Sequence, residues 1–306
     1  MSAERHALPG QRWHFQHGPI DIVIGADGEA SAVQAAHEAA WLRFTTVLDE
    51  LVCELPELRQ PVGERCTLVG TVARRMWQAC QPYRTGFVTP MAAVAGSVAQ
   101  ELIEHYTRPG VQRAWVNNGG DIALHLAPGQ SVTVGVYADI AALNAAQLRN
   151  GLVLDGQIRI DSAMPVRGVA TSGWRGRSQS LGIADSVTVL ARTAAQADAA
   201  ATVVANAVNV QDARIDRMPA WLVRDDSDLG AIPVTVDVPD LPEEQVRRAL
   251  QQGLQKAQEL QSSGLLWFAL LACQGQFLAT AAPQALAGAV WPPQAVMKSE
   301  VGSVFA

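Results

Sequence analysis

Apolar side chains recur along this chain at two spacings, which divide it into short strands and long helices. Residues 12–16 and 20–24 are strand-like runs on either side of His17-Gly18-Pro19, so a hairpin is predicted there. The next helix is expected to begin at a capping box formed by Ser31 and Gln34. Its apolar residues follow a three-to-four spacing and should face the core: Val33, Ala36, Ala40, Phe44, Val47 and Leu51.

Two more helices are predicted over residues 68–79 and 91–106. Thr89 can cap the second of them, and Pro90 suits its first position. The first two turns of this helix, from Met91 through Ala92 to Gly96, consist mostly of small side chains, which let a ligand or another backbone approach closely. Close packing against another helix explains the same residues.

The rest of the chain alternates between strands and helices without a regular βαβ repeat. Thr193, with Gln196, is expected to cap a helix that runs to about Val208, and Asp240 to cap a polar helix over 241–263. This irregular order favours an α+β fold over a doubly wound parallel sheet. Strands are expected at 114–116, 122–126 and 131–137, as an antiparallel meander, and at 159–160, 169–170, 187–190, 265–272 and 277–280.

Three short segments carry residues suited to ligand binding. Asp198, Thr202 and Asn206 are four residues apart and so share one helix face, where the carboxylate and hydroxyl can offer oxygens to Mg²⁺. Such residues can also simply face solvent or favour the helix dipole. The turn 117–121, with Asn118, Gly119, Gly120 and Asp121, and the strand end Thr171, Ser172 and Gly173 can hold a phosphate or ring carbonyl, but both also fit ordinary turns.

Composition narrows the classes of function. The net charge is −6 and only Lys256 and Lys298 are lysines, so no basic stripe exists to follow nucleic-acid phosphates. The longest apolar run, 265–273, is too short to span a bilayer, and no membrane partner is expected. The four cysteines lack disulfide-framework or zinc-site spacing and are expected to be buried or idle. The common hydrolase and nucleotide-binding motifs are absent.

Taken together, the three segments resemble the motifs of the ApbE-like superfamily, whose best known members are Mg²⁺-dependent FAD:protein FMN transferases. Residues 118–121 resemble its Gly-Gly-Asp turn, 170–173 its Thr-Ser-Gly strand end, and 197–202 its Ala-Asp-x-x-x-Thr helix. Residues 89–96, Thr-Pro-Met-Ala-Ala-Val-Ala-Gly, resemble an uncharacterised branch of the superfamily. The resemblance covers roughly residues 12–280.

The resemblance implies an ApbE-like, T-fold-like arrangement of antiparallel sheets packed with long helices, with two related halves in one compact unit. It also implies Asp198 and Thr202 as metal ligands for Mg²⁺ and FAD or FMN as the ligand. The residues expected to bind this cofactor are Thr89, Met91, Ala92, Gly96, Asn118, Gly119, Gly120, Asp121, Thr171, Ser172 and Gly173.

Two functions remain open at the level of sequence. One is a Mg²⁺-dependent FMN transferase or FAD pyrophosphate hydrolase. The other is a non-catalytic ligand-binding or accessory protein that serves a redox enzyme or a homocysteine-forming sulfur-assimilation pathway. The chain departs from the transferase pattern, because Ala95 replaces a lysine before Gly96 and the His-x-x-Asp-Pro segment is shortened to residues 178–185.

The expected organisation is a single domain at 12–283 between an N-terminal tail, 1–11, and a C-terminal tail, 284–306. The first 30 residues hold no continuous apolar stretch of a secretory signal, so a cytoplasmic location is expected. By analogy with other small α+β domains, we also expect a homo-oligomer.

Overall fold

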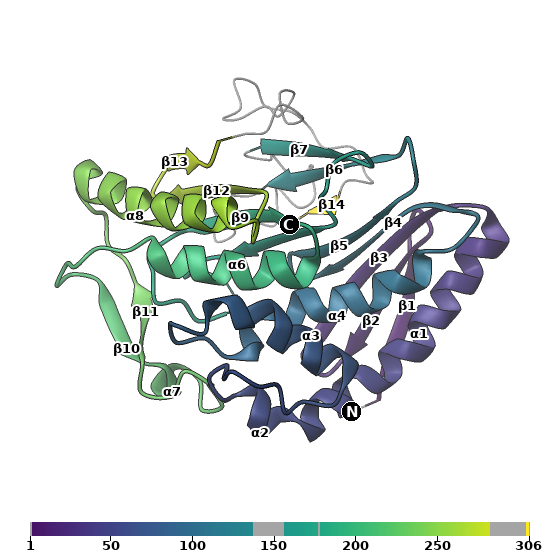
Figure 1. The fold of residues 1–306 in the computed structure, drawn as a ribbon, viewed down its shortest axis with the longest axis horizontal. Coiled ribbons are helices and arrows are strands. Elements are labelled where there is room, and N and C mark those ends of the chain that lie inside the picture. The colour runs from purple at the N-terminus through teal and green to yellow at the C-terminus, as the bar shows by residue number, and fades with distance from the viewer. Residues whose placement is uncertain (1, 137–155, 177, 282–303, 306) are drawn as a thin grey trace.

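A nine-stranded antiparallel sheet forms the centre of the structure, a computed structural model that describes residues 2–136, 156–176, 178–281 and 304–305 (Figure 1). Its strand order within these residues is β1-β2-β3-β4-β5-β8-β9-β12-β13. The large antiparallel sheet confirms the predicted α+β class. The strands are β1 (Glu4–Leu8), β2 (Arg12–His17), β3 (Ile20–Gly28), β4 (Val111–Asn118), β5 (Asp121–Leu126), β8 (Gly168–Ser172), β9 (Ser186–Ala191), β12 (Phe268–Cys273) and β13 (Gln276–Ala279).

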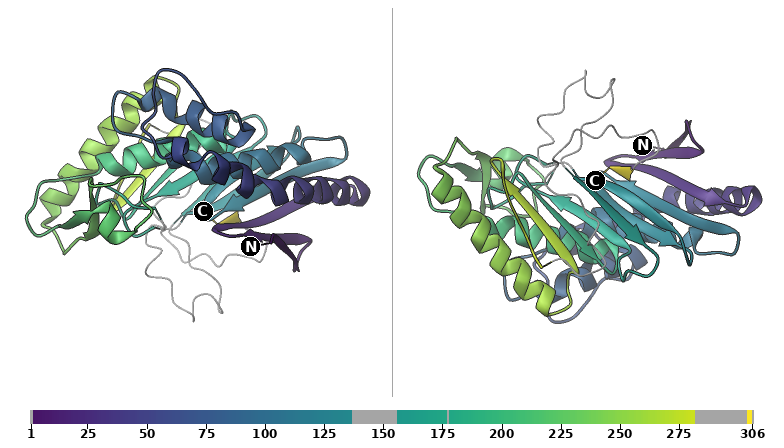
Figure 2. Two further views of the ribbon diagram at one scale, coloured as in Figure 1. Left: turned by 90° about the horizontal axis from the view of Figure 1, so that it is seen from below. Right: turned by 90° about the horizontal axis from the view of Figure 1, so that it is seen from above.

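The longer helices cover one face of this sheet, and a small second sheet lies against the other (Figures 1 and 2). The helices are α1 (Ala30–Cys53), α2 (Leu55–Leu58), α3 (Thr71–Cys80), α4 (Val94–Ile103), α6 (Ala194–Ala207), α7 (Ala220–Val223) and α8 (Glu243–Ser262), with 3-10 turns η1 (Gln81–Tyr83), η2 (Pro90–Ala93) and η3 (Glu104–Tyr106). The second sheet contains β14 (Val304–Phe305), β6 (Ser131–Val136) and β7 (Gly156–Asp161), and β10 (Asp216–Pro219) pairs with β11 (Pro233–Asp237).

Alternating side chains of the central strands supply two separate cores. On β5, Ile122 and Leu124 belong to the core beneath β6 and β7, whereas Ala123 points to the helices. On β8, Val169 likewise belongs to the core beneath β6 and β7, whereas Ala170 points to the helices. Since successive side chains of a strand point to opposite faces, one strand can serve both layers.

The first long helix confirms the predicted core face but not the predicted cap. All six apolar positions of α1 are buried. Its N-cap is Glu29, and no side chain caps the helix, so Ser31 lies inside the first turn. The capping-box prediction was wrong because Glu29 N–H is already bonded to the carbonyl of Gly110, which starts the helix earlier.

The predicted caps can be compared with the structure at three other helices. The Thr193 side chain accepts a hydrogen bond from Gln196 N–H, which confirms the predicted cap of α6. At the fourth helix of the chain, the predicted single span is divided into η2, α4 and η3, and Thr89 makes no side-chain cap. The polar helix α8 begins after Pro242 and not at Asp240.

The pairing of two strands also differs from the prediction. Residues 4–8, expected in a tail, form β1 and pair with β2. The strand after β5 does not complete a meander, because β5 pairs with β8 through Ile122 and Val169, and β6 pairs with β7 instead. A local alternation of apolar residues predicts that a strand forms, but it does not specify the partner. Of the expected tail at 284–306, only 304–305 lie within the described residues.

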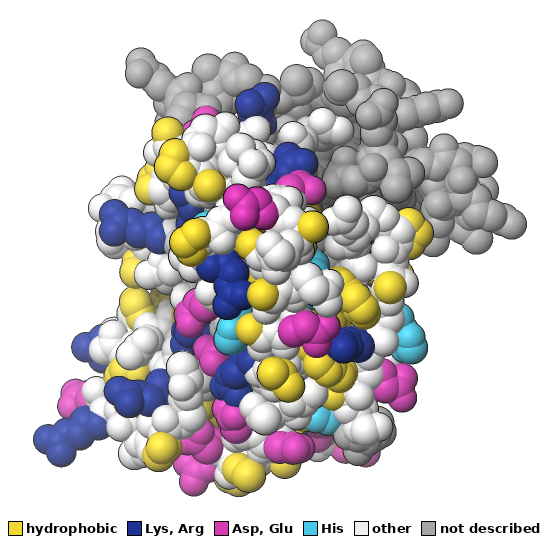
Figure 3. Space-filling view, turned by 90° about the vertical axis from the view of Figure 1, so that its right-hand side faces the viewer, with side chains coloured by type: hydrophobic (Ala, Val, Ile, Leu, Met, Phe, Trp, Pro, Cys, Tyr) yellow, Lys and Arg dark blue, Asp and Glu magenta, His cyan; other side chains and the backbone are white. Residues whose placement is uncertain are grey.

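Acidic and basic side chains are interspersed on the face of the molecule shown in Figure 3. In the parts of the chain that the structure describes, no helix is both long enough and apolar enough to cross a bilayer.

Candidate functional site

A cavity of about 240 Å³ lies where η2, the start of α4, the β4–β5 turn and α6 meet. Residues from two of the three sequence motifs and from the 89–96 segment line it, although the motifs are far apart in the chain. The lining residues that were predicted from the sequence are Thr89, Met91, Ala92, Asp121, Asp198 and Thr202.

Asp198 is held at the start of α4 by two backbone amides. Its Oδ2 accepts a hydrogen bond of 2.8 Å from Gly96 N–H, and Ala95 N–H donates to the same carboxylate. These amides belong to the first turn of α4, whose own N-cap supplies no side chain. The Asp198 carboxylate therefore satisfies helix donors that would otherwise lack a partner. Burial nevertheless dominates and raises the pKa of Asp198 to about 7.

Gly96 allows α4 and α6 to approach closely. A Cβ atom at this position would lie 2.3 Å from the carbonyl oxygen of Ala194 and 2.8 Å from the Cβ of Asp198. Gly96 does not line the cavity. Of the two explanations for the small-residue segment, close helix packing accounts for Gly96, while Met91 and Ala92 face the cavity.

The turn between β4 and β5 is a tight hairpin that presents Asp121 to the cavity. Gly119 and Gly120 have φ values of 67° and 111°, which favour glycine, and Gly120 N–H donates to Asn117 Oδ1 at 2.8 Å. Asn118 Nδ2 donates to the Ala95 carbonyl at 3.1 Å, which links the turn to α4. The hairpin explanation thus holds for the glycines, whereas Asp121 reaches the site.

Asp121 is a buried carboxylate with an unused acceptor. Its Oδ1 has no hydrogen-bond partner among the described residues, while the backbone N–H of Thr171 donates to the carboxylate. Burial raises the pKa of Asp121 well above its ordinary range, and the charge of Asp198 raises it further. Two carboxylates that disfavour each other's charge in one cavity favour the binding of a cation.

The Thr171-Ser172-Gly173 strand end lies outside the cavity. Thr171 Oγ1 is 3.1 Å from Thr188 Oγ1 on β9, so its hydroxyl is used within the sheet. A Cβ on Gly173 would lie 2.3 Å from the Asp185 carbonyl oxygen, so this glycine is required by packing. Only the backbone amide of Thr171 contributes to the site, through Asp121.

Asn206, the third residue of the predicted helix face, supports the cavity wall. Its Oδ1 accepts hydrogen bonds from Ser180 Oγ at 3.1 Å and from Leu181 N–H at 2.9 Å. Both Asn206 and Leu181 line the cavity. The side-chain oxygen of Asn206 therefore already accepts hydrogen bonds from the shortened 178–185 segment. Thr202 lies one helical turn after Asp198 on the same face of α6.

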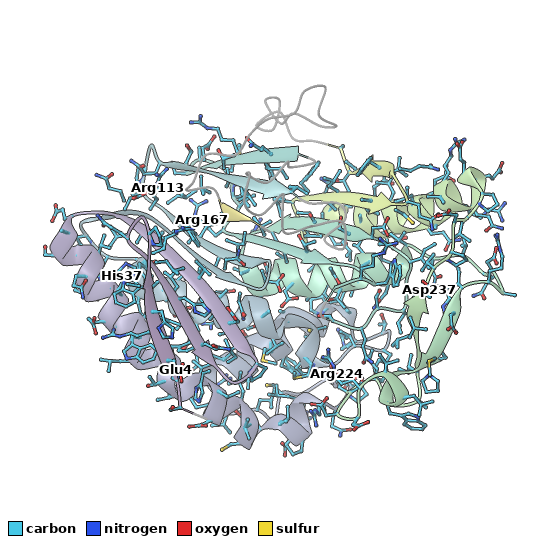
Figure 4. All side chains as sticks on the ribbon, turned by 180° about the vertical axis from the view of Figure 1, so that it is seen from behind. Glu4, His37, Arg113, Arg167, Arg224 and Asp237 are labelled. Carbon is cyan, nitrogen blue, oxygen red and sulfur yellow. The ribbon has the colours of Figure 1, made fainter. Side chains whose placement is uncertain are left out.

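Another part of the cavity lining comes from residues that sequence reasoning missed. Residues 224–229, between α7 and β11, form a segment that we call the strap. The Thr89 hydroxyl donates to Asp228, Ser227 Oγ donates to Gln179, and Arg59 pairs with Asp226 at 3.0 Å. Arg224, labelled in Figure 4, also lines the cavity, as do Phe87 and Leu229. The acidic run 225–228 was the only local signal, and it gives no indication of contacts so distant in sequence.

Thiol chemistry is disfavoured beside this cavity. Cys80 is buried, and burial together with the charges of Asp198 and Asp228 raises the pKa of its thiol well above the ordinary value. A protonated thiol is a poor nucleophile. Of the four cysteines that were expected to be buried or idle, Cys80 and Cys273 are buried, whereas Cys53 and Cys66 are exposed.

The residues present suit a hard cation held by oxygen ligands. Asp121 offers an unpartnered buried oxygen, and Asp198 and Thr202 offer a carboxylate and a hydroxyl from one helix face. In the described ranges, no group of three or more His, Cys, Asp or Glu side chains is placed to hold a metal by itself. This donor set matches Mg²⁺, which commonly takes one or two carboxylates and completes its octahedron with water or phosphate oxygens.

Comparison with known proteins identifies the family. The UPF0280 protein of Methanopyrus kandleri is 37% identical over 196 residues, which cover 63% of this chain and 72% of that protein. The UPF0280 protein of Archaeoglobus fulgidus is 34% identical over 204 residues, which cover 65% and 76%.

Among solved structures, the apo form of the Pseudomonas stutzeri flavinyl transferase ApbE aligns with a TM-score of 0.46 and 14% identity, over 94% of this chain and 96% of that one. The apbe protein of Thermotoga maritima aligns with a TM-score of 0.41 and 13% identity, over 90% of this chain and 97% of that one.

The sequence model of the family described as AbpE bacteria matches residues 5–279. The chain therefore belongs to this ApbE-like family, as its motifs predicted.

Proposed function

We propose that the protein binds a flavin nucleotide through its diphosphate, with Mg²⁺ held by Asp121, Asp198 and Thr202. The observation that carries this proposal is the buried, unpartnered Oδ1 of Asp121, which lies in the same cavity as Asp198. Leaving a buried acceptor without a partner costs roughly 1–3 kcal/mol. A bound cation removes that cost and the repulsion between the two carboxylates.

The charges along the cavity support a ligand that carries phosphate groups. Arg59, which pairs with Asp226 of the strap, and Arg224 line the same cavity as the carboxylates of Asp121 and Asp198. A diphosphate bound to Mg²⁺ can face the two carboxylates through the cation and approach the guanidinium groups with its remaining oxygens. Phe87, 46% exposed at the cavity wall, offers an apolar ring to the rest of the ligand.

The reaction that suits this arrangement is cleavage of the FAD pyrophosphate. An attacking hydroxyl, from water or from an acceptor protein, forms a bond to the flavin-side phosphorus while the bond to the bridging oxygen breaks. AMP leaves with the bridging oxygen, and the proton of the attacking hydroxyl passes to solvent. Mg²⁺ supplies charge neutralisation and orientation of the phosphates in such a displacement. The protein residues hold the cation, position the diphosphate and exclude water with Met91, Leu181 and Leu229.

Release of AMP from FAD tests this function. We expect the purified protein to release AMP from FAD in the presence of Mg²⁺ and to lose this activity when EDTA is added. In Asp121→Asn, the rate of AMP release should fall on the order of a hundredfold. Asp225→Asn is the matched control, because Asp225 is exposed on the strap and does not line the cavity. Absence of AMP release together with absence of labelled acceptor protein would rule out both the hydrolase and the transferase.

A second function, ligand binding without catalysis, is favoured by one observation. Asp198 is already bonded to the amides of Ala95 and Gly96, which gives its carboxylate a structural role that needs no metal. In this case the protein retains flavin without converting it and serves a redox enzyme or a sulfur-assimilation pathway. A preparation that binds FAD by calorimetry but releases no AMP over many hours supports binding over catalysis.

A further inference from the structure

The strap contributes a third carboxylate, that of Asp228, to the cavity lining, and this carboxylate accepts a hydrogen bond from the Thr89 hydroxyl. Thr89 is only 2% exposed, and its hydroxyl donates to Asp228 Oδ2. A threonine hydroxyl has a single proton to donate. While this bond exists, Thr89 cannot donate to a phosphate oxygen, although it belongs to the cavity wall.

Asp228 lines the same cavity as the two motif carboxylates, Asp121 and Asp198. The charges of Asp228 and Asp198 both raise the pKa of the buried Cys80 thiol. With Asp121, the cavity is lined by three carboxylates that are not paired with an arginine in any described contact, whereas Asp226 is paired with Arg59. An anion that enters without a cation meets the carboxylate of Asp228, which has no arginine partner among the described contacts.

We propose that Asp228 is a specificity-determining residue, which makes the cavity select a diphosphate ligand as its divalent-cation complex and reject the same ligand when it is free. The inference rests on the proposed function and adds a role for the strap. A free diphosphate must overcome the charge of Asp228 and compete for the Thr89 hydroxyl. A cation complex carries less negative charge and offers its cation to Asp121 and Asp198, so the charge of Asp228 opposes it far less.

The test is binding of ADP, the diphosphate half of FAD, measured by calorimetry with Mg²⁺ or with EDTA. We expect the wild type to bind ADP much more tightly with Mg²⁺. Asp228→Asn keeps an acceptor for Thr89 but removes the charge, and should tighten Mg²⁺-free binding on the order of tenfold, with a change below about threefold for the complex. Asp225→Asn, an exposed strap residue, should change neither value.

A second pair of variants separates charge from hydrogen bonding. Asp228→Ala also frees the Thr89 hydroxyl, so it should tighten Mg²⁺-free binding more than Asp228→Asn does. Thr89→Val in the Asp228→Ala background should abolish this extra gain. Circular dichroism of each variant shows whether the fold is retained, and the two substitutions at Asp228 give independent measurements if one of them is unstable.

The outcomes distinguish this inference from the proposed function. If wild-type protein binds Mg²⁺·ADP but the Asp228 variants leave the Mg²⁺-free affinity unchanged, or change both affinities equally, the role of Asp228 is overturned and the proposed function stands. If no variant binds ADP under either condition, the diphosphate site is wrong and the inference falls with it.

Discussion

Asp198 has two roles with opposite energetic consequences. Its carboxylate completes the first turn of α4 through Gly96 N–H, which stabilises the fold. Its burial penalises the charged form, and the pKa rises from an ordinary 3.8 to about 7. Between these values the folded state binds more protons than the unfolded state. The contribution of Asp198 to stability is therefore largest below about pH 4 and falls as the pH rises to about 7.

This linkage gives a prediction for Asp198→Asn. The amide oxygen can still accept from Gly96 N–H, but it carries no charge. We expect the unfolding free energy of the variant, relative to wild type, to increase between pH 5 and pH 8 when EDTA is present. Urea unfolding at both pH values measures this difference. A difference that stays constant with pH, or that decreases, would show that burial does not control this carboxyl.

At the scale of single residues, the sequence singled out some of the residues that line the cavity and missed others. Asp121, Asp198 and Thr202 were singled out because the turn and the helix that carry them resemble motifs of the ApbE-like superfamily, and the structure brings all three to one cavity. Asp228 could not be found in this way. Its partner Thr89 is 139 residues away, and no periodic pattern predicts the contact that joins them.

At the scale of the elements, Gly96 sets how closely α4 and α6 pack. A Cβ at position 96 would lie 2.3 Å from the carbonyl oxygen of Ala194, so α4 and α6 must separate in Gly96→Ala. Despite the better helix propensity of alanine, we expect a loss of about 2 kcal/mol in unfolding free energy, typical of overpacking. Gly63→Ala is the control, since no atom lies within 4 Å of its Cβ position. Equal stability of both variants in urea would contradict the close approach.

The caps of α6 and α1 provide a second comparison between elements. Thr193 accepts from Gln196 N–H, whereas Ser31 is exposed inside the first turn of α1. Thr193→Ala should therefore cost about 1 kcal/mol, and Ser31→Ala should stay within about 0.5 kcal/mol of wild type. Thermal unfolding of the two variants measures the difference. A larger loss for Ser31→Ala than for Thr193→Ala would contradict the assigned helix starts.

These caps also show why helix boundaries were harder to predict than helix faces. Ser31 and Thr193 begin equally good capping sequences, but the hydrogen bond from Glu29 N–H to Gly110 places the start of α1 before Ser31. The apolar face of α1 depends only on spacing along the helix and was predicted correctly, from Val33 to Leu51. Tertiary contacts decide the ends, and they cannot be derived from a local sequence pattern.

For the whole molecule, strand pairing and a shared core join the two halves. The sheet continues from β5 to β8 through the pair Ile122 and Val169. Ala194, at the start of α6, belongs to the core of the N-terminal half, formed mainly around α1, β3 and α4. We therefore expect one cooperative transition in calorimetry, with equal calorimetric and van't Hoff enthalpies, in agreement with the single domain predicted from the sequence.

Val169→Ala tests this coupling at the point where the halves meet. Val169 is fully buried and contributes to the core between the two sheets. The variant should lose about 2 kcal/mol, and for a cooperative unit of this size its melting temperature should fall by roughly 3–4 °C. If the halves unfold as one unit, as we expect, tryptophan fluorescence and far-ultraviolet circular dichroism should report the same lower midpoint. If the two signals separate, or if a second calorimetric peak remains at the wild-type temperature, the halves are independent domains.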